Sequence, residues 1–501
     1  MPFILSVDQG TSSTRAVLID CNTGVIVSDH NVALPSIYPQ EGWVEIQPQL
    51  ILETTYECID TVVAAGEAAG VPLDEIAGLG ITNQRGTTVV WDAKTGKALC
   101  NAIVWLDNRT AETVKQLVAA TPSKTPTHFQ STVGLPIAPS FSAVMLRWLL
   151  DNVPEVAGEG VLFGTVDSWL IWNLTRNKEE GQDGVHVTDV TNASITMLMN
   201  LHTLDWDDDM CHFFGVSRDM LPKICSSVEI YGVIGHGKMK GKPISGCLGD
   251  QQAALFGQHC FQRGEAKCTY GTGCFMVSNT GTEPVQSQHG LLTTVAYKVG
   301  SAPAVYSLEG AAYIGGEVVR WLRDNLKIIS SSSEVEQLSE TVDSSHDLFF
   351  VPAFSGLYHA PYWDPAARGI IIGITAYTHS GHIARAALEA VCFQVCEILQ
   401  SMEADSGIKQ QCLRIDGGMT ENKHFLRMQA DILGIPVECR AESAEATAIG
   451  AGMAAAMALG IWNVEKLPGE VMNYDANLGD KEREKKLARW KDAVKRSRNW
   501  V

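Results

Sequence analysis

Residues 246–252 read Gly-Cys-Leu-Gly-Asp-Gln-Gln, which places one carboxylate, Asp250, at the end of a short apolar run beside a small-residue turn. The start of the chain has the same layout, because Phe3–Val7 runs into Asp8-Gln9-Gly10-Thr11-Ser12-Ser13-Thr14. This recurrence predicts two related halves that face each other across a cleft. We expect each half to offer a carboxylate and a loop rich in backbone donors, which suits phosphoryl transfer from a nucleotide to a hydroxyl.

Length and composition agree with two domains. A chain of 501 residues is too long for one ordinary hydrophobic core, and the pattern restarts near 245–255. We therefore expect an N-terminal domain over 1–248 and a C-terminal domain over 249–501. Hydrophobic residues make up 45% and charged residues 19%, which is typical of a soluble globular protein.

The charge and the cysteines restrict the class of protein. A net charge of −19 argues against nucleic acid as the main partner, since nucleic-acid binding needs a basic surface. Thirteen cysteines are scattered without Cys-x-x-Cys pairs, which favours reduced thiols in a cytoplasmic protein. No apolar run reaches 18 residues and the N-terminus begins with a strand-like run, so we expect neither a transmembrane helix nor a signal peptide.

The hydrophobic pattern predicts an α/β protein. Three short strands form a meander, a helix follows, and a buried strand then delivers Asn83-Gln84-Arg85 to its carboxyl end, where ligands bind in open α/β sheets. A loop-rich region is expected up to about residue 240. The predicted strands cover 3–7, 16–20, 25–28, 76–82, 102–106, 244–248, 266–269 and 274–278, and the predicted helices cover 48–65, 141–150, 311–326, 380–404, 420–433, 446–460 and 481–498.

The segment from Asp8 to Arg15 is a candidate phosphate and metal site. A turn of Gly, Thr and Ser can aim several N–H and O–H donors at phosphate oxygens, and Arg15 adds a charged donor. Asp8 would hold Mg²⁺ through water. The turn Gly271-Thr272-Gly273 is its counterpart in the second half. The alternative for both segments is an ordinary hairpin turn.

Two further groups of residues suggest chemistry. Asp250 at a strand end can act as a general base towards a substrate hydroxyl, or it can simply cap the helix that starts at Gln251. Arg85 offers forked donors and Trp105 an apolar wall, although each also fits a structural role. The glycine pair in Asp416-Gly417-Gly418 lies where a strand meets a helix, which suits either a nucleotide contact or a helix cap.

Several segments in the same order resemble the FGGY family of carbohydrate kinases, and among them the members that phosphorylate glycerol. The resemblance covers essentially the whole chain. It rests on residues 8–15, 42–45, 82–85, 104–107, 189–194, 249–252, 269–275, 355–358 and 416–418. It implies two actin-like (ribonuclease H-like) α/β domains that flank a deep cleft.

The resemblance also implies roles for single residues. The expected reaction is ATP-dependent phosphorylation of glycerol to sn-glycerol 3-phosphate, with Mg²⁺ as the cofactor and Asp250 as the general base. A cytoplasmic homodimer or homotetramer is also implied. The implied polyol site comprises Arg85, Trp105, Asp250, Gln251 and Phe275, and the implied nucleotide site comprises Thr11, Ser12, Ser13, Arg15, Thr272, Gly316, Arg320, Gly418 and Asn422. Arg320 stands where these kinases often have Gln.

Three positions depart from the family pattern. Gly86 replaces the Glu that accepts hydrogen bonds from glycerol, and Ser140 replaces a Tyr that contacts it. His359 is a residue that the family usually lacks, and it is a candidate to replace the missing Glu at the polyol site. Losing both contacts costs about 2.5–4 kcal/mol, on the order of 10²–10³-fold in glycerol affinity. Two alternatives therefore stay open: a kinase of another small polyol or sugar, and a catalytically weak ATP-binding paralogue.

Overall fold

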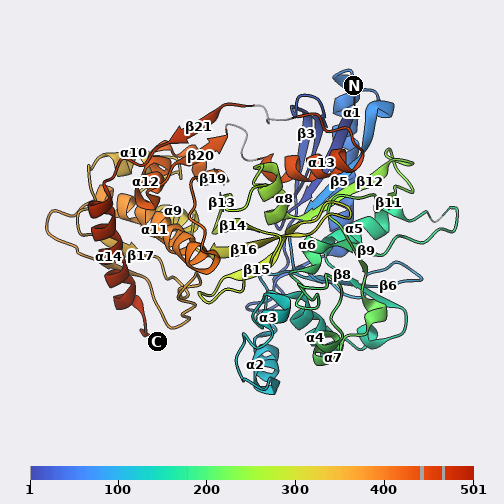
Figure 1. The fold of residues 1–501 in the computed structure, drawn as a ribbon, viewed down its shortest axis with the longest axis horizontal. Helices are drawn as coiled ribbons and strands as arrows, with labels where there is room; N and C mark the ends of the chain where they lie inside the picture. Colours follow the sequence, from blue (N-terminus) through green and yellow to red (C-terminus); the bar gives the residue numbers. More distant parts are fainter. Residues whose placement is uncertain (1, 178, 441–444, 465–468) are drawn as a thin grey trace.

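The computed structural model describes residues 2–501 except 178, 441–444 and 465–468, and it folds as two halves, each built around a mixed β-sheet (Figure 1). The first sheet has six strands and the second has seven. In spatial order the first sheet comprises β11 (Gly232–Val233), β12 (Pro243–Gly249), β5 (Ile76–Asn83), β1 (Phe3–Gln9), β2 (Ser13–Asp20) and β3 (Ile26–Ala33). The second comprises β15 (Leu292–Tyr297), β16 (Val305–Ala312), β14 (Cys274–Gly281), β13 (Ala266–Tyr270), β19 (Leu413–Asp416), β20 (Val437–Arg440) and β21 (Val471–Tyr474).

The two sheets repeat one topology, which confirms the α/β fold of two related halves. Strand β1 pairs antiparallel with β2 and parallel with β5. Strand β13 likewise pairs antiparallel with β14 and parallel with β19. The N-terminal meander and the hairpin around Gly271-Thr272-Gly273 are therefore equivalent elements.

The expectation that Asp8 and Asp250 mark the two different halves is wrong. Strand β12, which leads to Asp250, lies parallel to β5 in the first sheet, two strands away from β1. An apolar run that ends in Asp shows where a strand stops, but it does not show which sheet the strand joins. Both carboxylates therefore come from the same sheet.

The region between residues 151 and 240 is not loop-rich as expected, because it contains several short helices and strands that contribute to an apolar core. Helix α1 (Pro48–Ala68) packs on β2 and β3, and α4 (Ser142–Asn152) confirms the helix expected at 141–150. The remaining elements are β4 (Glu45–Ile46), β6 (Val89–Asp92), β7 (Ala102–Ile103), α2 (Ala111–Ala120), α3 (Gln130–Val133), β8 (Val161–Gly164), α5 (Val166–Thr175), β9 (Val187–Asp189), α6 (Val190–Ala193), α7 (Asp208–Phe214) and β10 (Lys223–Cys225).

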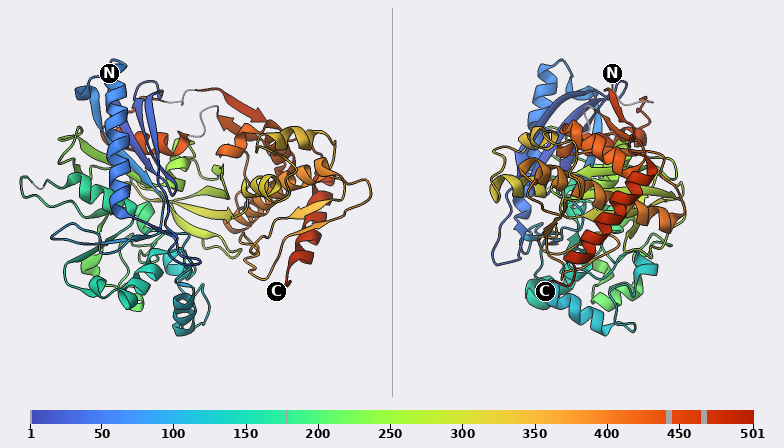
Figure 2. Two further views of the ribbon diagram at one scale, coloured as in Figure 1. Left: turned by 180° about the vertical axis from the view of Figure 1, so that it is seen from behind. Right: turned by 90° about the vertical axis from the view of Figure 1, so that its left-hand side faces the viewer.

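Helix α13 (Ala446–Ala458) returns from the second half of the sequence to cover the first sheet (Figures 1 and 2). It packs against α8 (Asp250–Gly257) and against β5. A Cβ atom on Gly80 of β5 would lie only 2.3 Å from the carbonyl oxygen of Ala451, so this close approach of helix and strand requires glycine. The domain boundary between 248 and 249 stays a prediction.

The second half is completed by helices around the long helix α11 (Ser380–Ser406). The helix expected at 311–326 is shorter, because β16 extends to Ala312. The charged terminal helix α14 (Asp480–Ser497) buries Trp490 in this core. The other elements are α9 (Glu317–Asp324), α10 (Glu334–Glu340), β17 (Phe349–Val351), β18 (Ile370–Ile372) and α12 (Lys423–Leu433). Among the described residues, no helix is long and apolar enough to cross a membrane.

Candidate active site

A cavity of about 430 Å³ is lined by side chains from both halves. It brings together most of the residues expected at a polyol site, while Gly86 lies beside the cavity without lining it. The expected residues in its lining are Arg85, Trp105, Ser140, Asp250, Gln251 and Phe275.

Arg85 is at the centre of a charged group in this cavity. Its Nε lies 3.3 Å from Oδ1 of Asp250, and its Nη1 lies 2.8 Å from Oε1 of Glu309 and 3.1 Å from Oε1 of Gln252. Arg85 follows strand β5, and Asp250 follows the adjacent parallel strand β12. The two side chains meet because the carboxyl ends of neighbouring parallel strands lie at one sheet edge.

The environment sets the protonation of these groups. Burial raises the pKa of Asp250, and the charges of Arg85 and Lys267 act against that rise. Burial also acts to raise the pKa of Glu309, but Arg85 outweighs it and holds this pKa below its ordinary value. Glu309 therefore stays ionised as the partner of Arg85, while Asp250, with 31% of its side chain exposed, remains accessible to a ligand.

Lys267 lies behind the lining residue Gln251, and an aromatic pair lines the cavity. Lys267 is fully buried, and its Nζ donates to Oε1 of Gln251 at 2.5 Å. Burial lowers the pKa of Lys267, whereas the nearby Asp416 and Asp250 carboxylates raise it. The rings of Trp105 and Phe275 meet edge to face with centroids 6.3 Å apart, so they offer apolar surface to the carbon atoms of a small polyol.

Gly86 cannot simply be exchanged for the family's Glu in this backbone. Its φ of +75° lies in the left-handed region, and a Cβ atom would stand 2.7 Å from the carbonyl oxygen of Ser140. Tyr313 enters the cavity from the second half beside Ser140. Partial burial raises the pKa of Tyr313, and a hydrogen bond with Ser140 acts against that rise. A tyrosine thus lies next to the position where the family's Tyr is missing.

His359 does not replace the missing Glu. It is buried outside the lining of this cavity, and its Nε2 lies 3.2 Å from Oε2 of Glu397. Trp490 donates its Nε1–H to the same oxygen at 2.8 Å. His359 therefore belongs to a structural group that joins α11 to α14.

A second cavity, also of about 430 Å³, lies in the second half. Asn422 caps helix α12, since its Oδ1 accepts the N–H of Phe425 at 2.8 Å, and its buried Nδ2 has no partner among the residues that the structure describes. This amide remains free to donate to a bound ligand. Arg320 is paired with Glu317 at 3.0 Å at the edge of the site. Five residues expected at the nucleotide site line this cavity: Thr272, Gly316, Arg320, Gly418 and Asn422.

The first hairpin turn lies outside both cavities. Thr11, Ser12 and Ser13 occupy the junction of β1 and β2, where Thr11 accepts the Nε1–H of Trp105 at 3.0 Å. Arg15 forms an ion pair with Glu445. At the end of β1, burial and the charge of Asp250 raise the pKa of Asp8 to about 7. A bound cation would favour the charged form of this buried carboxylate.

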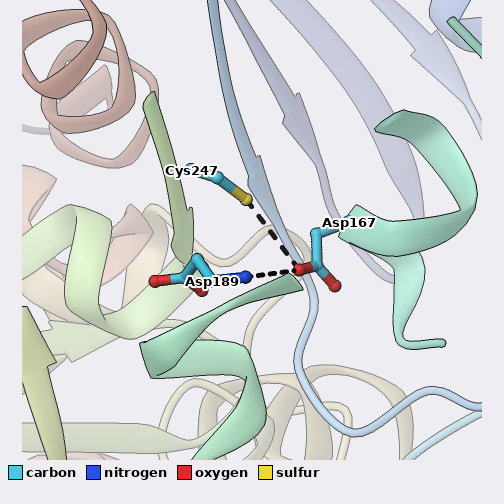
Figure 3. Close-up of side chains that lie close together, drawn as sticks. All are labelled: Asp167, Asp189 and Cys247. Atoms are coloured by element: carbon cyan, nitrogen blue, oxygen red, sulfur yellow. Dashed lines mark hydrogen bonds between the residues drawn. The ribbon is translucent and has the colours of Figure 1, made fainter. Parts of the chain in front are cut away.

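A buried network that includes Asp167, Asp189 and Cys247 supports strand β12, which leads to Asp250 (Figure 3). Asp167 accepts the backbone N–H of Asp189 at 3.2 Å and lies beside Cys247 of β12. Asp189 in turn accepts the hydroxyl of Thr191 at 2.8 Å, and Thr191 accepts the N–H of Gly249 at 2.8 Å. Burial and Asp167 raise the pKa of Asp189 to about 7. These bonds fix the residue that precedes Asp250.

Sequence reasoning missed three members of the site: Gln252, Lys267 and Glu309. Lys267 and Glu309 lie inside apolar strands, between Ala266 and Cys268 and after Leu308. A charged side chain within a buried strand needs a partner of opposite charge or a ligand, so each was a detectable signal. The partner itself was not detectable, because Arg85 and Glu309 are 224 positions apart.

Known proteins provide a further comparison. The N-terminal domain of the FGGY family of carbohydrate kinases matches residues 3–257, and its C-terminal domain matches residues 266–459. A glycerol kinase of Roseiflexus sp. (strain RS-1) is 49% identical, covering 100% of this chain and 99% of that protein. A probable glycerol kinase of Caenorhabditis elegans is 44% identical, covering 100% of both.

A solved structure has the same fold over nearly the whole chain. The crystal structure of Plasmodium falciparum glycerol kinase with ADP is 38% identical with a TM-score of 0.90, covering 99% of this chain and 98% of that one. Gluconate kinase from Lactobacillus acidophilus, at 22% identity and a TM-score of 0.83, shares the fold. The conserved topology, the two cavities and the family matches together place this chain in the FGGY family of carbohydrate kinases.

Proposed function

We propose that this protein transfers the γ-phosphate of ATP to a terminal hydroxyl of glycerol and forms sn-glycerol 3-phosphate. The observation that carries the proposal is the contact between Asp250 and Arg85 in the first cavity. Arg85 also forms an ion pair with Glu309, which lines the same cavity. A second cavity lined by five of the nine residues expected at the nucleotide site supports it. The relatives named glycerol kinase, 44% to 49% identical over the full chain, agree with this reaction.

Asp250 is the proposed general base. Its raised pKa strengthens it as a proton acceptor, and its exposure lets a substrate hydroxyl reach it. The hydroxyl oxygen forms the new bond to the γ-phosphorus, the bond to the β-phosphate oxygen breaks, and ADP leaves. Arg85 would orient the polyol through its forked donors, and its charge favours the ionised form of Asp250.

Asp8 is the proposed magnesium residue. Burial and the charge of Asp250 raise the pKa of Asp8, and Arg15 acts against that rise; a carboxylate in this setting fits the donor set of a divalent cation. When bound with ATP, Mg²⁺ would neutralise phosphate charge. Thr11, Ser12, Ser13 and Arg15 are the proposed phosphate contacts from the first half, and Thr272 is the proposed contact from the second.

The polyol contacts differ from those of the family pattern at two points. Gly86 provides no carboxylate, and Tyr313 lies beside Ser140. We propose that Glu309 and Tyr313 offset part of the loss, so that glycerol binds more weakly than the family pattern implies but still productively. The dimeric or tetrameric state and the cytoplasmic location stay predictions.

Initial rates of ADP formation over glycerol concentrations from micromolar to molar test this proposal. Saturation at some glycerol concentration, with sn-glycerol 3-phosphate as the product, supports it. ATP hydrolysis that glycerol does not accelerate at any concentration would contradict it and favour the ATP-binding paralogue.

A further inference from the structure

The polyol cavity has two chemically different parts. Its charged groups lie within hydrogen-bonding distance of one another around Arg85. Most of the remaining lining carries no polar side chain. This apolar chamber is formed by Pro136, Ile137, Ala138, Ile195, Leu291 and Leu292.

Glycerol alone leaves most of this space empty. Cavities of about 300–1,000 Å³ hold drug-sized ligands, and this one has about 430 Å³, whereas glycerol has only six non-hydrogen atoms. The charged end suffices to hold a diol. The apolar chamber would then be filled by water that has few hydrogen-bonding partners, which is unfavourable.

The chamber wall is held in place by specific bonds. The backbone N–H of Leu291 donates to Oγ of Ser287 at 2.9 Å, and Asp405 accepts the N–H of Gln288 at 3.0 Å and Nδ1–H of His289 at 2.6 Å. At the edge of the cavity, Nε1–H of Trp363 donates to the carbonyl of Gly290 at 2.8 Å. The apolar surface is therefore a built feature rather than a loose loop.

Two aromatic side chains border the opening of the chamber. Tyr313 is 42% exposed and Trp363 is 40% exposed, and their rings meet edge to face with centroids 6.5 Å apart. Both line the cavity. They provide apolar surface for a chain that leaves the chamber towards solvent.

We propose that the site accepts glycerol ethers that carry a short unbranched alkyl chain, and that it phosphorylates their free terminal hydroxyl; this inference rests on the proposed function. The diol binds at Arg85 and Asp250, and the alkyl chain occupies the chamber. The hydroxyl oxygen bonds to the γ-phosphorus of ATP, its proton goes to Asp250, and ADP leaves. The product is a 1-O-alkylglycerol 3-phosphate.

The apolar wall distinguishes this substrate class from a longer polyol or a sugar. Additional hydroxyls that lie against Ile137, Ile195 and Leu291 find no hydrogen-bonding partner in these side chains, which costs free energy. The polar side chains in the rest of the lining, outside the charged group, include Thr127, Gln130 and Ser140. An alkyl chain loses nothing there and gains from each buried methylene.

The test compares kcat/KM for glycerol with the values for its 1-O-methyl, ethyl, propyl and butyl ethers, with diglycerol as the polar compound of similar length. We expect kcat/KM to rise along the series, to about tenfold above glycerol for the butyl ether, and diglycerol to fall below glycerol. Turnover of glycerol with rejection of all four ethers would overturn this inference alone. No turnover of any compound would overturn the proposed function as well.

A substitution in the wall of the apolar chamber tests whether the alkyl chain binds there. Ala138→Phe adds volume where the chamber wall is apolar, and Ala138→Ser is the matched control because it adds almost none. We expect Ala138→Phe to lower the ratio of kcat/KM for the butyl ether to that for glycerol by at least about tenfold, and Ala138→Ser to preserve the ratio. An unchanged ratio in a folded Ala138→Phe protein would contradict the placement, and the ether series on the unaltered protein decides the matter if that variant does not fold.

Discussion

The two cavities are built in different ways. The polyol cavity depends on charged side chains from distant parts of the chain, with Arg85, Asp250 and Glu309 in contact. The second cavity depends on turns and helix ends, including Gly316, Gly418 and the cap residue Asn422. Side-chain contacts can be changed by single substitutions while the backbone stays in place. Two departures from the family pattern, Gly86 and Ser140, fall on the polyol side, while Arg320 lines the second cavity.

The largest effect is expected from Asp250→Asn. Removing the proposed base should lower kcat by about 10³-fold, whereas ADP affinity should change by less than about threefold, because the second cavity is untouched. Steady-state kinetics and calorimetric titration with ADP measure the two effects. Asp60→Asn, on the exposed face of α1, is the matched control. Equal losses in kcat and in ADP binding would show that the two cavities are not independent.

Glu309→Gln should affect the polyol side alone. It keeps the shape but removes the buried negative charge that faces Arg85, and such a loss is strongly unfavourable. We expect KM for glycerol to rise by about 10- to 100-fold, with KM for ATP unchanged. Glu67→Gln on the exposed part of α1 is the control. A comparable rise in KM for ATP would argue against the separation of the two cavities.

The pH dependence should report the metal residue. Asp8 must lose its proton to hold Mg²⁺, and its pKa in the free protein is raised to about 7. We therefore expect kcat/KM for MgATP to rise by about tenfold per pH unit up to pH 7 and to level off above it. For the same reason, the charged form of Asp8 costs stability in the metal-free protein as pH rises from about 4 to 7. Asp8→Asn should flatten the profile, and an unaltered profile in that variant would assign the titration to another group.

The smallest expected effects are on stability, and they come from one glycine substitution beside each cavity. Gly86→Ala should lower the free energy of unfolding by about 1–2 kcal/mol, because φ is positive and Ser140 lies in the way. Gly418→Ala should change it by less than about 0.5 kcal/mol, since a Cβ there meets nothing within 4 Å. Denaturant unfolding measures both. A larger loss for Gly418→Ala would contradict the geometry.

The same reasoning predicts that Gly86→Glu does not restore glycerol affinity. The longer side chain meets the same backbone strain before its carboxylate can reach the cavity. A lower KM for glycerol in Gly86→Glu would show that the backbone at this position adapts to its side chain.

The local sequence pattern predicted the helices, strands and turns better than it predicted which strands lie next to each other in a sheet. The hairpin turns and the strand before Arg85 were predictable, because apolar runs and small residues determine them locally. The sheet that β12 joins was not predictable, because β12 pairs with β5 across more than 150 positions. Helix α13 crosses back to the first sheet for the same kind of reason: its Ala/Gly-rich surface fits against Gly80.

The site residues also divide into those that the sequence predicts and those that only the fold reveals. Those within recognisable segments, such as Arg85, Asp250 and Thr272, were found from the sequence and line the cavities. Glu309 and Lys267 were missed, because their role depends on partners that only the fold brings near.

The most direct test follows the phosphate itself. Phosphorus NMR of a mixture of ATP, Mg²⁺, glycerol and this protein should show one new phosphomonoester, sn-glycerol 3-phosphate, growing in step with ADP, and Asp250→Asn should abolish it within the same period. Inorganic phosphate in place of the phosphomonoester, or equal product with Asp250→Asn, would contradict transfer to glycerol with Asp250 as the base.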